Sequence, residues 1–394
     1  MKSVLLRILA IMLTWVLVAA SCLKDEPDNK PDPKPEPDNE IVAPLPEMTL
    51  REKVGQLFFV RPESLAPTVE WAQYIGYMDI PLTEVTPEMK SYNADYPVGG
   101  IILFNNNIQD ETQLARFIPQ IRALKGSPLL CIDEEGGRVA RIANNDNFDV
   151  EKFESMAAVG ATGDPSNAYY CGKTIGTYLH KYGFDIDFAP VADVNTNPGN
   201  IVIGDRAFSD SPAVAASMVT AYLQGLDDAG IVGCIKHFPG HGDVSADTHF
   251  FYAQSMKSWS EMLSCEMVTF KAGIAWGCRM IMTTHIAAPA VTCSDVPATM
   301  SSVILQDKLR DELGYKGVII TDAMNMGAIT SQYSSGEAAV RSIKAGVDII
   351  LCPRDFMTAF DAVVEAVQNG EISEERIDRS VQRVLSLKEH CGRL

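Results

Sequence analysis

The sequence predicts a single (β/α)8 barrel of the TIM type, and the prediction depends on two patterns. Short apolar runs rich in β-branched residues alternate with longer amphipathic segments, which is typical of a parallel sheet covered by helices. Eight such runs follow one another, at residues 56–60, 99–104, 129–133, 184–191, 233–237, 280–285, 317–322 and 347–352. An open doubly wound sheet is the alternative, but the sequence has neither a glycine-rich dinucleotide fingerprint after an early strand nor a GxxxxGK[ST] motif.

Amphipathic segments between the runs are predicted to be the helices of this barrel. They include residues 111–124, 167–182, 213–229, 259–273, 303–313 and 336–345. Each of them leads from one predicted strand to the next, as the alternation of a (β/α)8 barrel requires.

Composition excludes several classes of protein. The chain has 394 residues, 46% of them hydrophobic, which is enough to bury a large core and excludes a disordered protein. Thirty-three lysines and arginines stand against 51 acids, so the net charge is −18 and no nucleic-acid partner is expected. Nine cysteines occur without a CxxC pair, so their spacing indicates neither a zinc ribbon nor a small disulfide scaffold.

Residues 1–21 have the features of a secretory signal peptide. Lys2 and Arg7 precede an apolar run that ends in small residues. A membrane-anchor helix is the alternative, because the run is near the lower limit for spanning a bilayer. Cys22 directly follows Ala-Ala-Ser, which resembles a bacterial lipoprotein processing site, although the same cysteine could follow an ordinary signal peptide. We expect a lipid anchor on Cys22 that attaches the protein to a membrane of the cell envelope.

Residues 22–46 are predicted to be an acidic, proline-rich tether. Segment 23–40 contains five prolines, seven acids and three lysines, so no core can form and the prolines favour an extended chain. The run Lys-Asp-Glu at 24–26 resembles the export signal of surface lipoproteins in some Gram-negative bacteria, with a plain solvated linker as the alternative. The barrel is assigned to residues 47–394.

Polar residues gather where the predicted strands end. In a barrel these ends share one rim with the loops that follow them, and active sites lie on that rim. The polar ends are 133–138 (DEEGGR), 193–195 (DVN), 236–242 (KHFPGHG), 284–285 (TH) and 321–322 (TD). One polar strand end is usually a helix cap, but five on one rim predict a polar cleft.

Two kinds of chemistry suit such a cleft. Zinc binding is one, because nitrogen and oxygen ligands are available from His237, His241, Asp247 and His249. Lys236 would place a positive charge beside the metal, so no metal is expected. Carboxylates together with lysine, histidine and arginine donors instead suit a ligand rich in hydroxyl groups, and carboxylates at a scissile bond suit glycoside hydrolysis.

Five motifs resemble glycoside hydrolase family 3. They are IDEEGGRVAR (132–141), DFAPVADVN (187–195), IGDRAF (203–208), KHFPGHGDVSADTH (236–249) and ITDAMNM (320–326). The resemblance extends over about residues 49–387, and the DTH form resembles the β-N-acetylglucosaminidase branch, which usually has DSH. Family 3 β-glucosidases usually take their acid/base carboxylate from a second domain, which is not expected here because the chain ends just after the eighth unit.

The resemblance implies a retaining mechanism with assigned roles. Asp322, in the TDA motif, matches the nucleophile, His249 matches the general acid/base, and Asp247 matches the partner of that histidine. The residues that match ligands of the terminal sugar are Asp133, Arg141, Arg206, Lys236 and His237. Ala323 and Thr248 depart from the usual pattern, but neither departure removes a functional group that the mechanism needs.

These roles agree with the chemistry of the side chains. Asp322 must be ionised to attack the anomeric carbon, and nearby lysine and arginine would hold its pKa down. His249 needs a pKa near the working pH to give and take a proton, and Asp247 can bind its other ring nitrogen.

The expected activity is that of an exo-β-N-acetylglucosaminidase (β-hexosaminidase). Its substrates would be peptidoglycan fragments or other glycans with a terminal β-linked N-acetylglucosamine, and no cofactor is expected. A family 3 β-glucosidase or xylosidase is the alternative within the same class. A non-catalytic glycan-binding lipoprotein is disfavoured because Asp322, Asp247 and His249 are all present. Cys131, Cys234 and Cys352 lie in apolar runs, where buried free thiols are expected.

Overall fold

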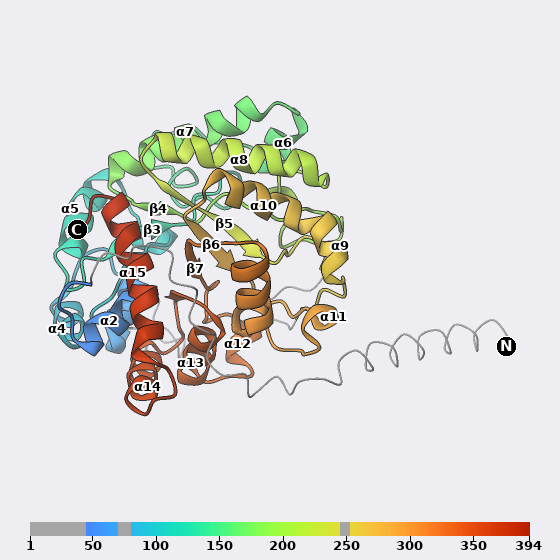
Figure 1. Ribbon diagram of the computed structural model, residues 1–394. Helices are drawn as coiled ribbons and strands as arrows, with labels where there is room; N and C mark the ends of the chain where they lie inside the picture. Colours follow the sequence, from blue (N-terminus) through green and yellow to red (C-terminus); the bar gives the residue numbers. More distant parts are fainter. Residues whose placement is uncertain (1–44, 70–79, 245–252) are drawn as a thin grey trace.

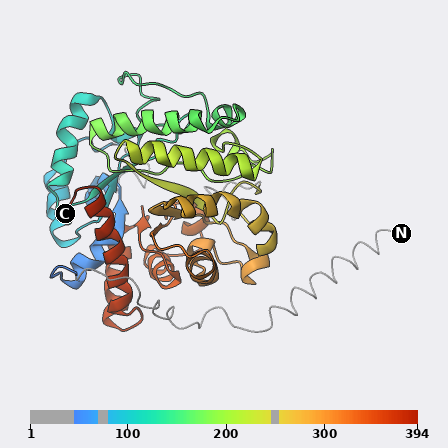
Figure 2. The same cartoon turned by 45° about the horizontal axis from the view of Figure 1, so that its top comes forward.

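The computed structural model describes residues 45–69, 80–244 and 253–394. Within these ranges, eight parallel strands form one sheet in the order β7-β6-β5-β4-β3-β2-β1-β8. A parallel bridge between Ile320 and Ile349 joins β7 to the segment before β8, so the two edges of the sheet meet. Helices surround the strands (Figure 1, Figure 2). The predicted (β/α)8 barrel is confirmed.

Each of the eight predicted runs contains or overlaps one strand. The strands are β1 (Phe58–Val60), β2 (Gly100–Ile102), β3 (Leu129–Ile132), β4 (Ile186–Asp187), β5 (Val232–Phe238), β6 (Met280–Thr283), β7 (Val318–Ile320) and β8 (Ile350–Leu351). Most strands are shorter than their runs, because the polar residues at the ends of the runs already belong to the loops.

Alternate residues of a strand face opposite layers of the core. Phe59 and Cys131 belong to the apolar cluster inside the barrel, whereas Phe58 and Leu130 pack between the strands and the helices. Gly100 is the parallel neighbour of Phe59, and a Cβ on it would lie 2.6 Å from the Phe59 ring. The glycine therefore makes room for the largest side chain of its neighbour strand.

Helices and short helical turns connect the strands. The α-helices are α2 (Leu50–Gln56), α4 (Pro87–Asp95), α5 (Glu111–Arg122), α6 (Met156–Ala161), α7 (Pro165–Tyr182), α8 (Pro212–Asp228), α9 (Trp259–Ser264), α10 (Glu266–Trp276), α11 (Pro289–Thr292), α12 (Gly327–Thr330), α13 (Ser335–Ala345), α14 (Phe356–Gln368) and α15 (Glu374–His390). The 3-10 turns are η2 (Pro62–Leu65), η3 (Asn105–Asn107), η4 (Gly204–Arg206) and η5 (Ala298–Met300), and η6 (Val303–Glu312) is a π-helix. Helices α7 and α8 lie side by side over one face of the barrel (Figure 1, Figure 2).

Two predicted helices differ in form from the prediction. Segment 259–273 is divided into α9 and α10, because Cys265 leaves the helical conformation with φ −129° and ψ −88°. The break places the carboxylate of Glu266 in the interior, where it forms an ion pair with Lys257. Segment 303–313 is helical, but its hydrogen bonds have the wider π spacing.

Helix α15 closes the end of the barrel at which the strands begin. Its residues Val384 and Leu387 belong to the apolar cluster inside the barrel. Lys388, one residue further, is buried and donates hydrogen bonds to Oε1 of Gln56 at 2.6 Å and to the carbonyl of Gly126. Both acceptors precede strands, β1 and β3. Within the described residues, α15 therefore fills this end of the barrel, and the cavity described below lies at the opposite end.

Some predictions from the sequence concern single residues or segments. Cys131 and Cys234 are buried with free thiols, as predicted, and Cys352 is buried as well. No helix within the described residues is long and apolar enough to cross a membrane. The signal peptide, Cys22 and nearly all of the tether lie outside the described residues, so these assignments stay predictions.

Candidate active site

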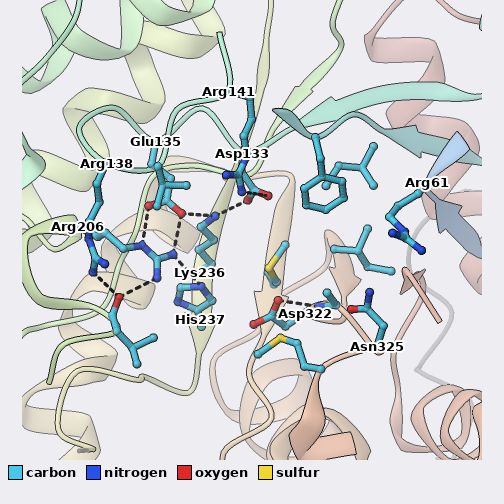
Figure 3. A pocket seen from close by; sticks show the side chains of 18 of the residues that line it. Arg61, Asp133, Glu135, Arg138, Arg141, Arg206, Lys236, His237, Asp322 and Asn325 are labelled. Atoms are coloured by element: carbon cyan, nitrogen blue, oxygen red, sulfur yellow. Dashed lines mark hydrogen bonds and ion pairs between the residues drawn. The ribbon is translucent and has the colours of Figure 1, made fainter. Parts of the chain in front are cut away.

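A cavity of about 720 Å³ lies at the carboxyl ends of the strands (Figure 3). Loops that follow β1, β2, β3, β4, β5 and β7 all contribute to its lining. Six of the residues predicted to form the site line this one cavity, namely Asp133, Arg141, Arg206, Lys236, His237 and Asp322.

Lys236 is the centre of an ion-pair network on one wall of the cavity. Its ammonium nitrogen lies 2.7 Å from Oδ1 of Asp133 and 2.6 Å from Oε1 of Glu135. Arg206 binds Glu135 through two hydrogen bonds, 2.8 Å from Nε to Oε2 and 2.7 Å from Nη2 to Oε1. Arg141 approaches the other oxygen of Asp133 at 3.6 Å. The end of strand β5 and the loops after β3 and β4 thus form one wall that offers both donors and acceptors (Figure 3).

Glu135 and Lys236 stay charged although they are buried. Burial would raise the pKa of Glu135, but the charges of Arg206 and Lys236 hold that pKa well below its ordinary value. Burial would likewise lower the pKa of Lys236, and the carboxylates of Asp133 and Glu135 raise it above its ordinary value instead. The wall is therefore a fixed arrangement of charged donors and acceptors, which suits the hydroxyl groups of a sugar.

His237 is held by a carboxylate behind it. Its Nδ1 lies 2.6 Å from Oδ2 of Asp193, and the backbone N–H of His241 donates to Oδ1 of Asp193 at 2.6 Å. Burial would raise the pKa of Asp193, but the charge of His237 holds it below its ordinary value. Because Nδ1 is engaged, Nε2 is the ring nitrogen on the cavity side, 3.5 Å from Nη2 of Arg206.

The glycines of the KHFPGHG motif stand where the loop after β5 approaches other segments closely. A Cβ on Gly242 would lie 1.9 Å from the carbonyl oxygen of Val194, in the loop after β4. Gly240 has a φ of +126°, and a Cβ there would lie 2.4 Å from Cγ of Glu266. The motif therefore folds into a tight loop against its neighbours, which fixes the direction of His237.

Asp322 lies across the cavity from this wall, at the end of β7 (Figure 3). Its Oδ1 accepts a hydrogen bond from the N–H of Ala323 at 2.7 Å. Burial would raise the pKa of Asp322, but its surroundings hold this pKa below the ordinary value. The causes are the charges of His237 and His285, the hydrogen bond from Ala323 and the charge of Lys236. Asp322 is thus a carboxylate at neutral pH. The direction of this pKa shift agrees with the prediction, but its main causes are two histidines, followed by Lys236, and not the predicted arginines.

A buried carboxylate shapes the loop that carries Arg141. Glu134 accepts hydrogen bonds from the backbone N–H groups of Arg141, Ile142 and Ala143 at 2.5, 2.9 and 2.8 Å. Its side chain also accepts one from the hydroxyl of Tyr178 at 2.8 Å. The guanidinium of Arg141 is thereby directed at Asp133 and not away into solvent.

The sequence reasoning missed residues that the structure places in or behind the site. Glu135 and Asp193 stand in polar strand ends that the sequence identified, but neither was given a role. Both carboxylates are buried. The signal that could have found them is an acidic residue just after an apolar run, where a charge needs a partner. Asp247 and His249, the predicted acid/base pair, lie outside the described residues, so the structure does not test them.

The described residues also bear on the zinc alternative. No group of three histidine, cysteine, aspartate or glutamate side chains among them is arranged to hold a metal ion. Two of the four potential ligands, Asp247 and His249, are not among these residues. Of the other two, His237 uses Nδ1 to bind Asp193, which leaves one ring nitrogen toward the cavity.

The fold and the cavity define the class of protein. A (β/α)8 barrel with carboxylates, a lysine and arginines around a cavity at the carboxyl ends of its strands is typical of barrel enzymes that act on sugars. The model of the glycosyl hydrolase family 3 N-terminal domain matches residues 49–387. The chain therefore belongs to glycosyl hydrolase family 3, as its motifs predicted.

Relatives within this family are similar over most of the chain. A protein named β-hexosaminidase A from Pseudoalteromonas piscicida is 33% identical over 78% of this chain and 56% of its own length. A β-hexosaminidase from Stenotrophomonas maltophilia is 34% identical over 74% of this chain and 86% of its own length. The structure of a family 3 β-N-acetylglucosaminidase from Paenibacillus sp. is 36% identical with a TM-score of 0.80, covering 88% of this chain and 63% of that one. The chain thus spans little more than half of some relatives and most of others.

Proposed function

We propose that the protein is a retaining exo-β-N-acetylglucosaminidase, which removes terminal β-linked N-acetylglucosamine. The observation that carries the proposal is the position of Asp322. An ionised carboxylate faces a wall of sugar-binding donors and acceptors across one cavity, as a nucleophile at an anomeric carbon must. Relatives named β-hexosaminidase and β-N-acetylglucosaminidase support the choice of sugar.

In the proposed mechanism, the wall binds the sugar and Asp322 attacks it. Asp133, Lys236 and Arg206 are placed to bind hydroxyl groups, so that C1 is directed at Asp322. Attack forms the bond between C1 and a carboxylate oxygen and breaks the glycosidic bond, giving a covalent glycosyl-enzyme. Water then cleaves this intermediate with overall retention of the β configuration.

We propose His249 as the acid/base and Asp247 as its partner. His249 donates a proton to the departing oxygen in the first step and accepts one from water in the second. Asp247 binds the other ring nitrogen and so fixes the tautomer. A histidine in this role, in place of a carboxylate, adds no fixed negative charge beside the leaving group. This agrees with peptidoglycan fragments as substrates, because their muramic acid carries a carboxylate.

A panel of p-nitrophenyl glycosides tests the proposed function. Rates on the β-N-acetylglucosaminide, the β-glucoside and the β-xyloside are compared, and the first is expected to be the highest. A higher rate on the glucoside or xyloside would support the alternative activity in the same family, and no hydrolysis of any of them would support a glycan-binding protein.

A disaccharide substrate, added to the panel, tests the proposed role of His249. His249→Ala should lose about 10²–10⁴-fold on this unactivated substrate and much less on the p-nitrophenyl one.

We further propose that Cys22 is lipid-modified and holds the enzyme at the cell envelope, on the outer membrane. Segment 23–40 of the tether has one apolar side chain and cannot bind a membrane by itself. Cys22→Ala should therefore move the protein from the membrane fraction to the soluble fraction of cells. A variant that stayed with the membranes would mean that the apolar run is an uncleaved helix.

A further inference from the structure

The cavity has an end wall behind the sugar-binding network. Segment 201–203, in the loop after β4, lines the cavity, and so does Arg138 from the loop after β3. In the close-up, Arg138 lies beyond Arg206 on the side away from Asp322 (Figure 3). The order across the cavity is thus Asp322, then the hydroxyl-binding groups, then this end wall.

Arg138 fastens segment 201–203 to the loop after β3. Its Nη2 donates to three successive carbonyl oxygens, those of Ile201, Val202 and Ile203, at 3.0, 2.7 and 3.1 Å. Its Nε donates to Oδ1 of Asp205 at 2.8 Å. One guanidinium therefore binds the segment through Nη2 and Asp205 through Nε, and a side chain with a single donor nitrogen could not make both sets of contacts in the same geometry.

The same segment is fixed to the site from two further directions. Nη1 of Arg206 donates to the carbonyl of Val202 at 3.1 Å, so the residue that binds Glu135 also contacts the wall. Asn200, which is buried, accepts hydrogen bonds from the N–H groups of Val202 and Ile203 and donates to the carbonyl of His241 at 2.7 Å. The wall is therefore built into three loops of the rim, although the side chain of Ile201 at its tip is 76% exposed.

The position of the wall decides which end of a sugar it meets. In a pyranose ring C4 lies across from C1, and C1 must face Asp322. The 4-hydroxyl is therefore directed into the network of Asp133, Lys236 and Arg206, and a group attached to it would extend toward Arg138 and segment 201–203. A sugar chain that continued from O4 would meet the wall.

We propose that Arg138 is a specificity-determining residue. By fastening segment 201–203 it closes the cavity beyond the 4-hydroxyl, which restricts the enzyme to an unsubstituted terminal sugar. Arg138 acts through the wall and takes no part in the reaction. The inference rests on the proposed function, because it needs Asp322 as the residue that faces C1.

Two substrates that differ only at O4 test the wall. They are p-nitrophenyl β-N-acetylglucosaminide and its 4-O-methyl ether, and the measured quantity is the ratio of their kcat/KM values. The ether lacks the 4-hydroxyl proton in every variant, so the loss of that hydrogen bond cancels when ratios are compared between variants. In the wild type the ratio should strongly favour the unsubstituted sugar. Arg138→Ala should reduce the ratio at least tenfold.

Matched variants separate the wall from a simple effect of charge. Arg138→Lys keeps the positive charge but cannot bind Asp205 and three carbonyls at once, so it should reduce the ratio nearly as much as Arg138→Ala. Asp205→Ala, at an exposed position with little risk to folding, should reduce it by a smaller factor. Lys152→Ala removes an exposed lysine that pairs with Asp146 away from the cavity, and it should leave the ratio unchanged.

The outcomes distinguish failure of this inference from failure of the proposed function. An unchanged ratio in Arg138→Ala and Asp205→Ala, with hydrolysis of the unsubstituted substrate, would overturn the role of the wall. A ratio that Arg138→Lys keeps at the wild-type value would also overturn it, because charge and not fastening would then be responsible. A wild-type enzyme that hydrolyses neither substrate would overturn the proposed function instead.

Discussion

The two ends of the barrel contain buried charged networks that differ in what surrounds them. At the end where strands begin, Asp348 accepts from Arg310 at 2.7 Å, from Arg383 at 3.1 Å and from the hydroxyl of Ser380 at 2.6 Å. At the end where strands finish, Lys236 lies between two carboxylates at similar distances. In both networks, opposite charges compensate the cost of burial.

What differs is the access to each network. Asp348 is fully buried beneath α15, and its partners Arg310 and Arg376 are 2–3% exposed. Arg383, the third arginine, is 18% exposed, but it is not among the residues that line the cavity. In the upper network, Asp133 is 17% exposed and Arg141 is 23% exposed, both toward the cavity. Similar ion-pair networks thus lie closed behind α15 at one end of the barrel and open to the cavity at the other, which is the end where active sites of this fold lie.

Substitution of aspartate by asparagine should reduce activity at the cavity end of the barrel and stability at the other end. The largest expected effect is the loss of activity in Asp322→Asn. Asp322→Asn removes the charge of the proposed nucleophile and keeps its shape. The kcat on p-nitrophenyl β-N-acetylglucosaminide should fall at least about 10³-fold, which corresponds to roughly 4 kcal/mol of transition-state stabilisation. Stopped or continuous assays of p-nitrophenol release measure this directly.

The folded state of Asp322→Asn should lose at most a modest part of its stability. An asparagine oxygen can still accept from the N–H of Ala323, but the attraction of the ionised carboxylate to the nearby cations, which lowers its pKa, is lost. The melting temperature is therefore the control. Near-wild-type turnover in a folded variant would exclude Asp322 as the nucleophile.

Asp348→Asn should lose stability and keep the chemistry. The change leaves Arg310, Arg376 and Arg383 in a buried site without their shared carboxylate, which typically costs about 3–5 kcal/mol of unfolding free energy. Denaturant unfolding measures this loss, and the kcat per folded molecule should stay close to that of the wild type. A large fall in kcat without loss of stability would mean that the two ends of the barrel are not independent.

The stability that Asp348 contributes should also depend on pH. Burial would raise its pKa, but the charges of Arg383, Arg310 and Arg376 hold it below the ordinary value. A group with a lowered pKa in the folded state stabilises the protein above its unfolded pKa, and this stabilisation is lost as the pH falls. The difference in unfolding free energy between wild type and Asp348→Asn should therefore narrow on acidification.

Sequence patterns predicted the barrel well because it depends on residues close together in the chain. Each apolar run had the length and composition of a buried parallel strand. The polar residues at the ends of these runs predicted where the cavity lies. Asp133, Lys236 and Asp322 could be assigned to one site for this reason, although about 190 residues separate the first from the last.

What the sequence did not predict depends on contacts between distant segments. The pairing of Glu135 with Arg206 joins residues 71 positions apart, and that of Asp193 with His237 spans 44. Alternation of apolar and polar residues carries no information on which acid meets which base. The break at Cys265 was missed for the same reason, because the burial of Glu266 against the loop after β5 is a tertiary effect.

The smallest expected effect on stability concerns Asp187, the last residue of β4, at the same end of the barrel as Lys236. It is fully buried, its Oδ1 accepts from the N–H of Glu134 at 2.9 Å, and Oδ2 has no hydrogen-bond partner within the described residues. Burial raises the pKa of Asp187 well above its ordinary value, and the charges of Glu134 and Asp133 add to the effect. Asp187 thus differs from Asp348 in that no arginine compensates its burial.

The sign of the pH effect should accordingly be reversed at Asp187. Because the folded pKa is raised, the folded state keeps a proton that the unfolded state loses as the pH rises above about 4. The contribution of Asp187 to the unfolding free energy therefore falls over this range. Asparagine at this position does not titrate and still offers an oxygen to the N–H of Glu134. The melting temperature of Asp187→Asn, measured relative to wild type at several pH values, should rise from acid to neutral pH. A difference that is constant with pH would mean that Asp187 is ionised in the folded protein and is compensated by Lys236.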